Sequence, residues 1–240
     1  MPSRRAYSVS SRAIAIYAIP MFLVLTIWLF TPPTSAQNMK EVDLALVLAV
    51  DCSHSVSSAE FNLQMYGLAQ AFASREVIAA IGQKSIAVMV IQWSGRENQK
   101  VAVPWTIVNN SVTAHRIADA ISAAPRLSLG KTSISAAIDF AVNQLARSPV
   151  TARRHVIDIS GDGVNNDGEH TLPARERAIA AGITINGLTI LNDVQNLDNY
   201  FREFIVGGPG NFVIVANDYK AYIKAIKRKL LKEIKGLLVS

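Results

Sequence analysis

Short apolar runs alternate with helical patterns along most of this sequence, and this alternation constrains the fold more than any other feature. The strand-like runs are Leu44–Val50, Ser85–Trp93, Val101–Val108, His155–Ser160, Ile183–Ile190 and Phe212–Val215. The helix-like segments are Ser58–Ile81, Val112–Ala123, Ser133–Arg147, Leu172–Ala181, Asn196–Phe204 and Tyr219–Lys235. Apolar strands that alternate with helices predict an α/β fold, with a doubly wound, mostly parallel six-stranded sheet that has helices on both faces.

Local signals refine this prediction. The link between the second and third strands is short, from Ser94 to Lys100, so these strands should form a hairpin and leave one antiparallel strand at the edge. Ser57 and Ser58 precede Glu60 and are candidate caps for the first long helix. No segment has the composition of a linker, so we expect a single domain over residues 37–240.

The N-terminal segment has the pattern of a secretory signal peptide. Residues 1–12 carry three arginines and no acid, residues 13–30 are almost entirely apolar, and residues 31–36 contain prolines and small residues. This order predicts a signal peptide over residues 1–36, and an uncleaved N-terminal anchor is the alternative. The protein is therefore expected to be exported, to the periplasm or the extracellular space, with membrane contact only if this segment is uncleaved.

Charge and cysteine content narrow the possible functions. The leader holds three of the 24 basic residues and none of the 18 acids, so residues 37–240 carry a net charge of +3. An excess of this size does not indicate nucleic-acid binding. Cys52 is the only cysteine, so an exported domain would depend on its apolar core rather than on an internal disulfide. We expect Cys52 to pack beneath the end of a strand.

Polar residues with oxygen atoms follow several of the predicted elements. Asp51, Ser53 and Ser55 come directly after the first apolar run, Thr132 precedes a helix, and Asp162 follows the fourth strand. The carboxyl ends of parallel strands meet at one edge of such a sheet, where α/β proteins bind their ligands. Clusters that contain only oxygen ligands suit hard cations, namely Mg²⁺, Ca²⁺ or Mn²⁺.

These motifs resemble the metal-ion-dependent adhesion site of von Willebrand factor type A (vWA) domains. Asp51-x-Ser53-x-Ser55, Gly130-x-Thr132 and Asp162-Gly163 occur in the order and at the loop positions that this family uses. The segments Tyr200–Glu203 and Gly207–Phe212 also resemble a bacterial exported branch of this fold that is catalogued as a domain of unknown function. The resemblance extends over about the whole of residues 37–240.

The resemblance implies a role for each site residue. Ser53 and Ser55 would bind the metal directly, Thr132 directly or through water, and Asp51 and Asp162 mainly through waters and by orienting the hydroxyls. Because neutral hydroxyls neutralise little of the cation's charge, a carboxylate from a protein partner would complete its coordination. The expected protein is a monomeric binding module rather than an enzyme.

Two residues depart from the family pattern, and several alternatives remain open. His54 lies between the two serines, where the family often has glycine, and Lys131 places a cation beside Thr132.

A metal-dependent hydrolase that uses the same acids is one alternative function, and a structural envelope protein with an unused site is another. A P-loop is excluded because Pro125 takes the place of its first glycine.

The final helical segment, Tyr219–Lys235, is both basic and amphipathic. Such a helix is able to lie on an anionic membrane. We favour the alternative that its apolar stripe covers the last strands of the sheet and that its lysines are solvated.

Overall fold

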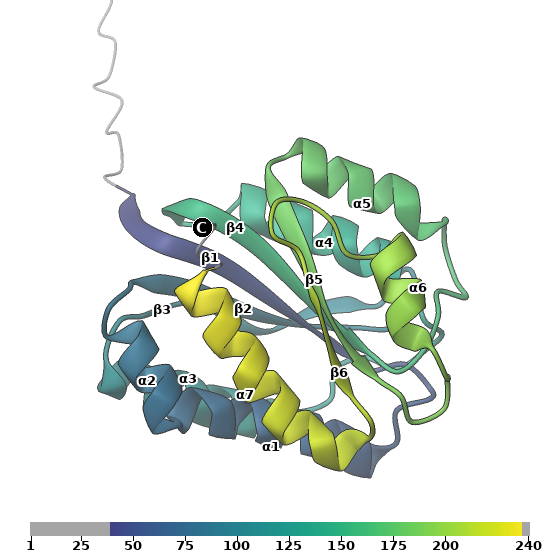
Figure 1. Cartoon of the computed structure of the whole chain (residues 1–240), viewed down its shortest axis with the longest axis horizontal. Helices are drawn as coiled ribbons and strands as arrows, with labels where there is room; N and C mark the ends of the chain where they lie inside the picture. Colours follow the sequence, from purple (N-terminus) through teal and green to yellow (C-terminus); the bar gives the residue numbers. More distant parts are fainter. Residues whose placement is uncertain (1–38, 237–240) are drawn as a thin grey trace, which may run out of the picture. The chain divides into compact units, whose positions relative to one another are not determined.

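A six-stranded sheet lies at the centre of the computed structural model, which describes residues 39–236 (Figure 1). Its strands are β1 (Lys40–Asp51), β2 (Ile86–Trp93), β3 (Gln99–Val108), β4 (Val150–Gly161), β5 (Ile183–Ile190) and β6 (Val213–Ala216). The helices are α1 (Ser58–Ala73), α2 (Arg75–Ile81), α3 (Ser111–Ala123), α4 (Ile134–Ala146), α5 (Thr171–Ala180), α6 (Leu197–Phe204) and α7 (Tyr219–Lys235). The predicted signal peptide, residues 1–36, lies outside the described residues and stays a prediction.

The strands are ordered β3-β2-β1-β4-β5-β6, and the predicted fold class is confirmed. All neighbouring strands are parallel except β2 and β3, which form the predicted antiparallel hairpin and place β3 at one edge. This edge strand carries the exposed residues Lys100 and Pro104, and the register of its pairing with β2 shifts at Val90. The opposite edge strand, β6, is only four residues long.

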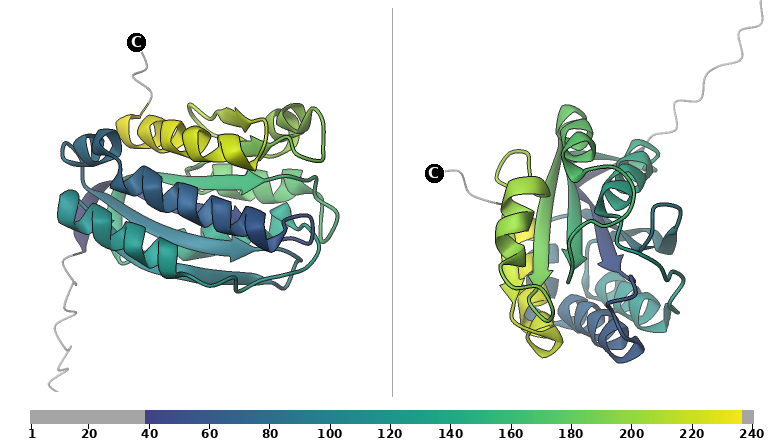
Figure 2. Two further views of the ribbon diagram at one scale, coloured as in Figure 1. Left: turned by 90° about the horizontal axis from the view of Figure 1, so that it is seen from below. Right: turned by 90° about the vertical axis from the view of Figure 1, so that its right-hand side faces the viewer.

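Alternate residues of the central strand β1 face two separate apolar layers. Leu44, Leu46 and Leu48 belong to the layer formed with α1, α2, α3 and α7, whereas Ala45 and Val47 belong to the layer formed with α4, α5 and α6. Figure 2 shows α1, α3 and α7 on one side of the sheet and α4 and α5 on the other. Because side chains alternate along a strand, a strand buried on both faces is apolar throughout, as the sequence of β1 is.

The prediction of one continuous helix over Ser58–Ile81 is wrong. The chain is extended at Ser74, with φ −72° and ψ 144°, and two helices, α1 and α2, meet there. The Ser74 hydroxyl donates to the Ala71 carbonyl oxygen over 2.7 Å and accepts from the Val77 amide over 3.4 Å. A serine side chain that bonds nearby backbone groups competes with the helical pattern, and here it ends one helix and begins the next.

Helix α7 covers the sheet, as predicted, but one of its lysines is not solvated. Tyr222, Ile226 and Leu230 are buried against the layer that contains α1. Lys229 is also fully buried, and its ammonium nitrogen lies 2.8 Å from the Asp158 carboxylate of β4 and 3.2 Å from that of Glu233. The expectation of a fully solvated set of lysines is therefore wrong at this position. None of the helices within residues 39–236 is long and apolar enough to cross a lipid bilayer.

Helix α1 begins with a capping box next to the loop that follows β1. The Ser57 hydroxyl accepts from the Glu60 amide over 3.3 Å, and the Glu60 carboxylate accepts from the Ser57 amide over 2.8 Å. Replacing Ser57 by alanine is expected to lower the free energy of unfolding by about 1 kcal/mol, because an orphan amide of the first turn loses its acceptor. Chemical denaturation measures this loss. Ser58→Ala, at the next exposed position, serves as the matched control and should change stability by less than about 0.5 kcal/mol.

Candidate metal centre

The first part of the site is the loop that follows β1. The side-chain oxygen Oδ1 of Asp51 accepts a 2.7 Å hydrogen bond from the Ser53 amide, so the acid folds the chain back over the end of its own strand. The backbone of this loop is tied to the neighbouring β2 by a bond from the Cys52 amide to the Trp93 carbonyl oxygen. Asp51, Cys52 and Ser53 are all fully buried.

A chain of hydrogen bonds joins this loop to the end of β4. The Ser55 hydroxyl donates to Oδ1 of Asp162 over 2.7 Å, and the Oγ atoms of Ser53 and Ser55 are 3.0 Å apart. Because Ser55 has a single hydroxyl proton, Ser53 is the donor in the second contact. Ser55 is exposed whereas Asp162 is fully buried. The cluster therefore reaches solvent through Ser55.

Thr132 comes to the same place from a third loop. Its amide donates to Oδ1 of Asn166 over 2.9 Å, and its carbonyl oxygen accepts from the amides of Asn166 and Asp167. A Cβ atom added to Gly163 would lie 4.0 Å from the Thr132 hydroxyl oxygen, so Thr132 lies directly beside the residue that follows Asp162. All five residues singled out in the sequence are thus gathered at the carboxyl edge of the sheet.

Both carboxyl groups of the cluster lie in surroundings that disfavour their charge. Burial, and to a smaller extent the charge of Asp162, raises the pKa of Asp51 to about 7. Burial also raises the pKa of Asp162. Oδ2 of Asp51 is buried and has no hydrogen-bond partner within the described part of the chain. A cation bound beside these oxygens would reverse this penalty.

The donor set fits a hard divalent cation. The cluster offers two carboxylates and three hydroxyls, which are the oxygen ligands that Mg²⁺, Ca²⁺ and Mn²⁺ prefer. Residues 39–236 contain no group of three or more His, Cys, Asp or Glu side chains suited to a metal ion. Metal binding at this edge would consequently depend on the serine and threonine hydroxyls.

Two residues that support the site were missed from the sequence. The Arg126 guanidinium donates to the carbonyl oxygens of Cys52 and Ser53 over 2.8 and 3.0 Å, which fixes the backbone of the first loop. The Tyr219 hydroxyl donates to Oδ2 of Asp162 over 2.7 Å from the first residue of α7. Neither residue belongs to a local motif, and both act through contacts between segments that are distant in sequence.

Both residues that depart from the family pattern, His54 and Lys131, have exposed side chains. The His54 amide donates to the Gly130 carbonyl oxygen over 2.8 Å, which joins two of the loops, and its side chain is exposed. Asn196 is the one non-glycine residue with positive φ in the described region, so the position of His54 does not require glycine. Lys131 is exposed beside Thr132.

Cys52 packs beneath the strand end as predicted, and burial raises the pKa of its thiol to about 12.

Comparisons with known proteins place the chain by family and by fold. Residues 41–238 match the family described as "Protein of unknown function (DUF1194)". A search of the curated proteins found no match. Among solved structures, proximal thread matrix protein 1 of the mussel byssus is similar, with a TM-score of 0.64 and 15% identity over 81% of this chain and 49% of that one. The chain thus spans about half the length of the mussel protein.

Other similar structures share the same fold. A second structure of the mussel protein, described as having a zinc-occupied MIDAS motif, gives a TM-score of 0.63 and 15% identity over 81% of this chain and 49% of that one. A von Willebrand factor type A protein from Catenulispora acidiphila gives 0.59 and 15% over 80% and 43% of the two chains. The vWF domain of the type V pili tip protein Mfa5 from Porphyromonas gingivalis gives 0.55 and 11% over 83% and 98%.

Proposed function

Because this chain belongs to the family described as "Protein of unknown function (DUF1194)" and has a vWA-like fold, we propose that it is an exported binding protein with a divalent-cation site. Asp51, Ser53, Ser55, Thr132 and Asp162 hold the cation, and a protein partner supplies a carboxylate to it. The proposal rests above all on the hydrogen-bonded chain from Ser53 through Ser55 to Asp162, beside the unpartnered Oδ2 of Asp51.

Charge balance supports a cation at this position. Neither Asp51 nor Asp162 forms an ion pair with a basic side chain of residues 39–236. Arg126, whose guanidinium contacts the loop after β1, donates to backbone carbonyl oxygens of that loop instead. Two buried carboxylates without a countercharge are costly, and a bound Mg²⁺ or Ca²⁺ would stabilise both.

The chemistry of the donor set supports binding rather than catalysis. Hydroxyl ligands leave the cation's charge poorly neutralised, so a carboxylate from a partner is a favourable additional ligand. Asp51 and Asp162 orient the Ser53 backbone and the Ser55 hydroxyl, respectively. The similar structures include a byssus matrix protein and a pilus tip protein, which favours a role in attachment outside the cell.

A metal titration tests this proposal. After treatment with EDTA, the protein should unfold at a higher temperature as Mg²⁺, Ca²⁺ or Mn²⁺ is added, because a ligand that binds only the folded state stabilises it. Ser53→Ala should lower the metal affinity obtained from this titration by about tenfold or more, since it removes a proposed direct ligand. Ser58→Ala is the matched control and should respond like the parent.

The outcome that contradicts the proposal is equally definite. If none of the three cations at millimolar concentration shifts the unfolding temperature or gives heat in a calorimetric titration, the cluster is not a metal site. A response that Ser53→Ala retains in full would place the metal elsewhere on the protein.

A further inference from the structure

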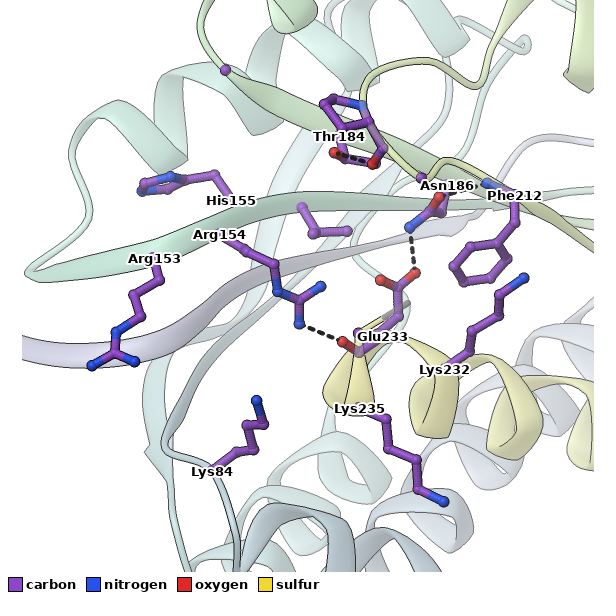
Figure 3. A pocket seen from close by; sticks show the side chains of 15 residues that line it. Lys84, Arg153, Arg154, His155, Thr184, Asn186, Phe212, Lys232, Glu233 and Lys235 are labelled. Carbon is purple, nitrogen blue, oxygen red and sulfur yellow. Dashed lines mark hydrogen bonds between the residues drawn. The ribbon is translucent and has the colours of Figure 1, made fainter. Parts of the chain in front are cut away.

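A cavity lies at the amino-terminal edge of the sheet, at the far end of the strands from the candidate metal centre. Its volume is about 560 Å³, and it is bounded by the starts of β4 and β5, the segment before β6 and the end of α7 (Figure 3). Arg154 lies in its wall and pairs in register with Leu44, near the start of β1, whereas the metal cluster begins at Asp51.

Unpaired positive charge surrounds this cavity. Lys84, Arg154, Lys232 and Lys235 line it from three separate segments of the chain. None of these four side chains forms an ion pair with a carboxylate of residues 39–236. By contrast, the neighbouring Arg153 is paired with two acids.

The one carboxylate in the cavity wall does not balance these charges. Glu233 is only 1% exposed. Its Oε1 accepts a 2.8 Å hydrogen bond from the side-chain Nδ2 of Asn186 and lies 3.2 Å from the Lys229 ammonium. Its charge is therefore directed into the protein, toward Lys229, and the solvent-facing part of the cavity stays electropositive.

Contacts with the cavity wall hold two of the four cationic side chains, those of Arg154 and Lys232, in place. Arg154 is half-buried, and its Nη2 donates to the Glu233 carbonyl oxygen over 2.6 Å. The Lys232 ammonium lies 3.9 Å from the centroid of the Phe212 ring, a cation–π contact. Figure 3 shows the side chains of Arg154 and Lys84 pointing toward each other across the cavity. Like charges that converge in this way repel unless an anion lies between them.

We propose that this cavity binds a phosphate-type anion. A guanidinium held by one of its nitrogens still offers several N–H groups to a second acceptor, and arginine and lysine together suit a phosphate group. A cavity of about 560 Å³ is larger than a single phosphate needs, so the ligand carries its phosphate on a larger polar body. Two sources fit this chemistry, a soluble phosphate compound and a phospholipid headgroup. A lipid source is relevant above all if the apolar segment 13–30 is the uncleaved anchor that the sequence offers as the alternative to a signal peptide.

Two double variants with the same change of charge test the proposal. Lys84→Gln/Lys232→Gln removes two cations of the cavity, and Lys220→Gln/Lys224→Gln removes two exposed lysines from the other half of α7. Full-length protein is titrated with pyrophosphate by calorimetry. It is also sedimented with vesicles of phosphatidylcholine alone and of phosphatidylcholine mixed with phosphatidylglycerol. Phosphatidylcholine alone measures binding that does not depend on the net charge of the lipid.

We expect the parent and the Lys220/Lys224 variant to bind the probe with the same affinity. The Lys84/Lys232 variant should bind it with an affinity lower by about tenfold or more. Binding to pyrophosphate indicates a soluble ligand, and binding only to phosphatidylglycerol vesicles indicates a lipid headgroup. The proposal is overturned if the parent binds neither probe, or if both double variants lose binding equally, since diffuse positive charge then explains the result. Neither variant alters the candidate metal centre, so this test is independent of the proposed function.

Discussion

Replacing Asp51 by asparagine is expected to abolish metal-induced stabilisation while leaving the metal-free protein at least as stable as the parent. Asparagine keeps a side-chain oxygen for the 2.7 Å hydrogen bond from the Ser53 amide. It removes a buried negative charge that is raised in energy by burial and by Asp162. The parent should gain about 2.7 kcal/mol when the metal is present at about 100 times its dissociation constant, and the variant should gain nothing. Thermal unfolding with and without Mg²⁺ measures both quantities.

This pair of measurements separates a metal site from a cluster that only caps a turn. If Asp51 merely held the turn, asparagine would hold it equally well, and added Mg²⁺ would change the stability of the parent and of the variant by the same amount. Asp119→Asn, at an exposed position on α3, removes the same charge and should leave the metal response unchanged. A partner captured from envelope extracts should also be released by EDTA and should fail to bind the Asp51 variant. Capture that is indifferent to both would contradict a metal-bridged contact.

Replacing Lys229 by methionine is expected to lower the free energy of unfolding by about 3–5 kcal/mol, because two buried carboxylates then lose their shared countercharge. Lys229, Asp158 and Glu233 are at most 2% exposed, and the lysine lies within 3.2 Å of both acids. This triad joins α7 to β4, and Asn186 of β5 donates to the same Glu233 oxygen. Chemical denaturation at neutral pH measures the loss. Lys224→Met, at an exposed position of the same helix, should change stability by less than about 0.5 kcal/mol.

A charge-free triad is the informative companion to this variant. Combining Lys229→Met with Asp158→Asn and Glu233→Gln should recover much of the lost stability, since no unpaired charge then remains buried. The single variant should also become less stable as the pH rises. Burial raises the pKa of both acids, so the folded state binds protons more tightly than the unfolded chain does, and that advantage disappears as the acids ionise. A single variant within about 1 kcal/mol of the parent would show that the triad does not hold α7 in place.

Local patterns were sufficient to predict the sheet, the hairpin and the positions of the candidate site. Asp51, Ser53 and Ser55 are separated by single residues after an apolar strand. Parallel strands in a doubly wound sheet bring their carboxyl ends together whatever the details of packing. For that reason Thr132 and Asp162 could be assigned to the same edge although they are far from Asp51 in the sequence.

Contacts between segments that are distant in the sequence were harder to predict, although the residue pattern indicates one of them. Asp158 interrupts an apolar strand, and Lys229 and Glu233 are four residues apart on the apolar stripe of α7. Polar residues at core positions on two elements indicate a buried pair. No residue pattern indicates the contact of Tyr219, because its hydrogen bond to Asp162 depends on where α7 begins in space. The helix break at Ser74 was missed because serine is tolerated within helices as well as at their ends.

The edges of the sheet determine whether a strand of another chain is able to add to it. Addition of a foreign strand requires an edge that offers backbone donors and acceptors in a regular row. On β3, Pro104 lacks an N–H group, Lys100 places a charge on the same edge, and the register shift at Val90 distorts the row. On β6, four residues provide too short a template. The sheet is therefore protected against polymerisation through its edges, and the proposed contact with a partner falls to the loops at its carboxyl edge.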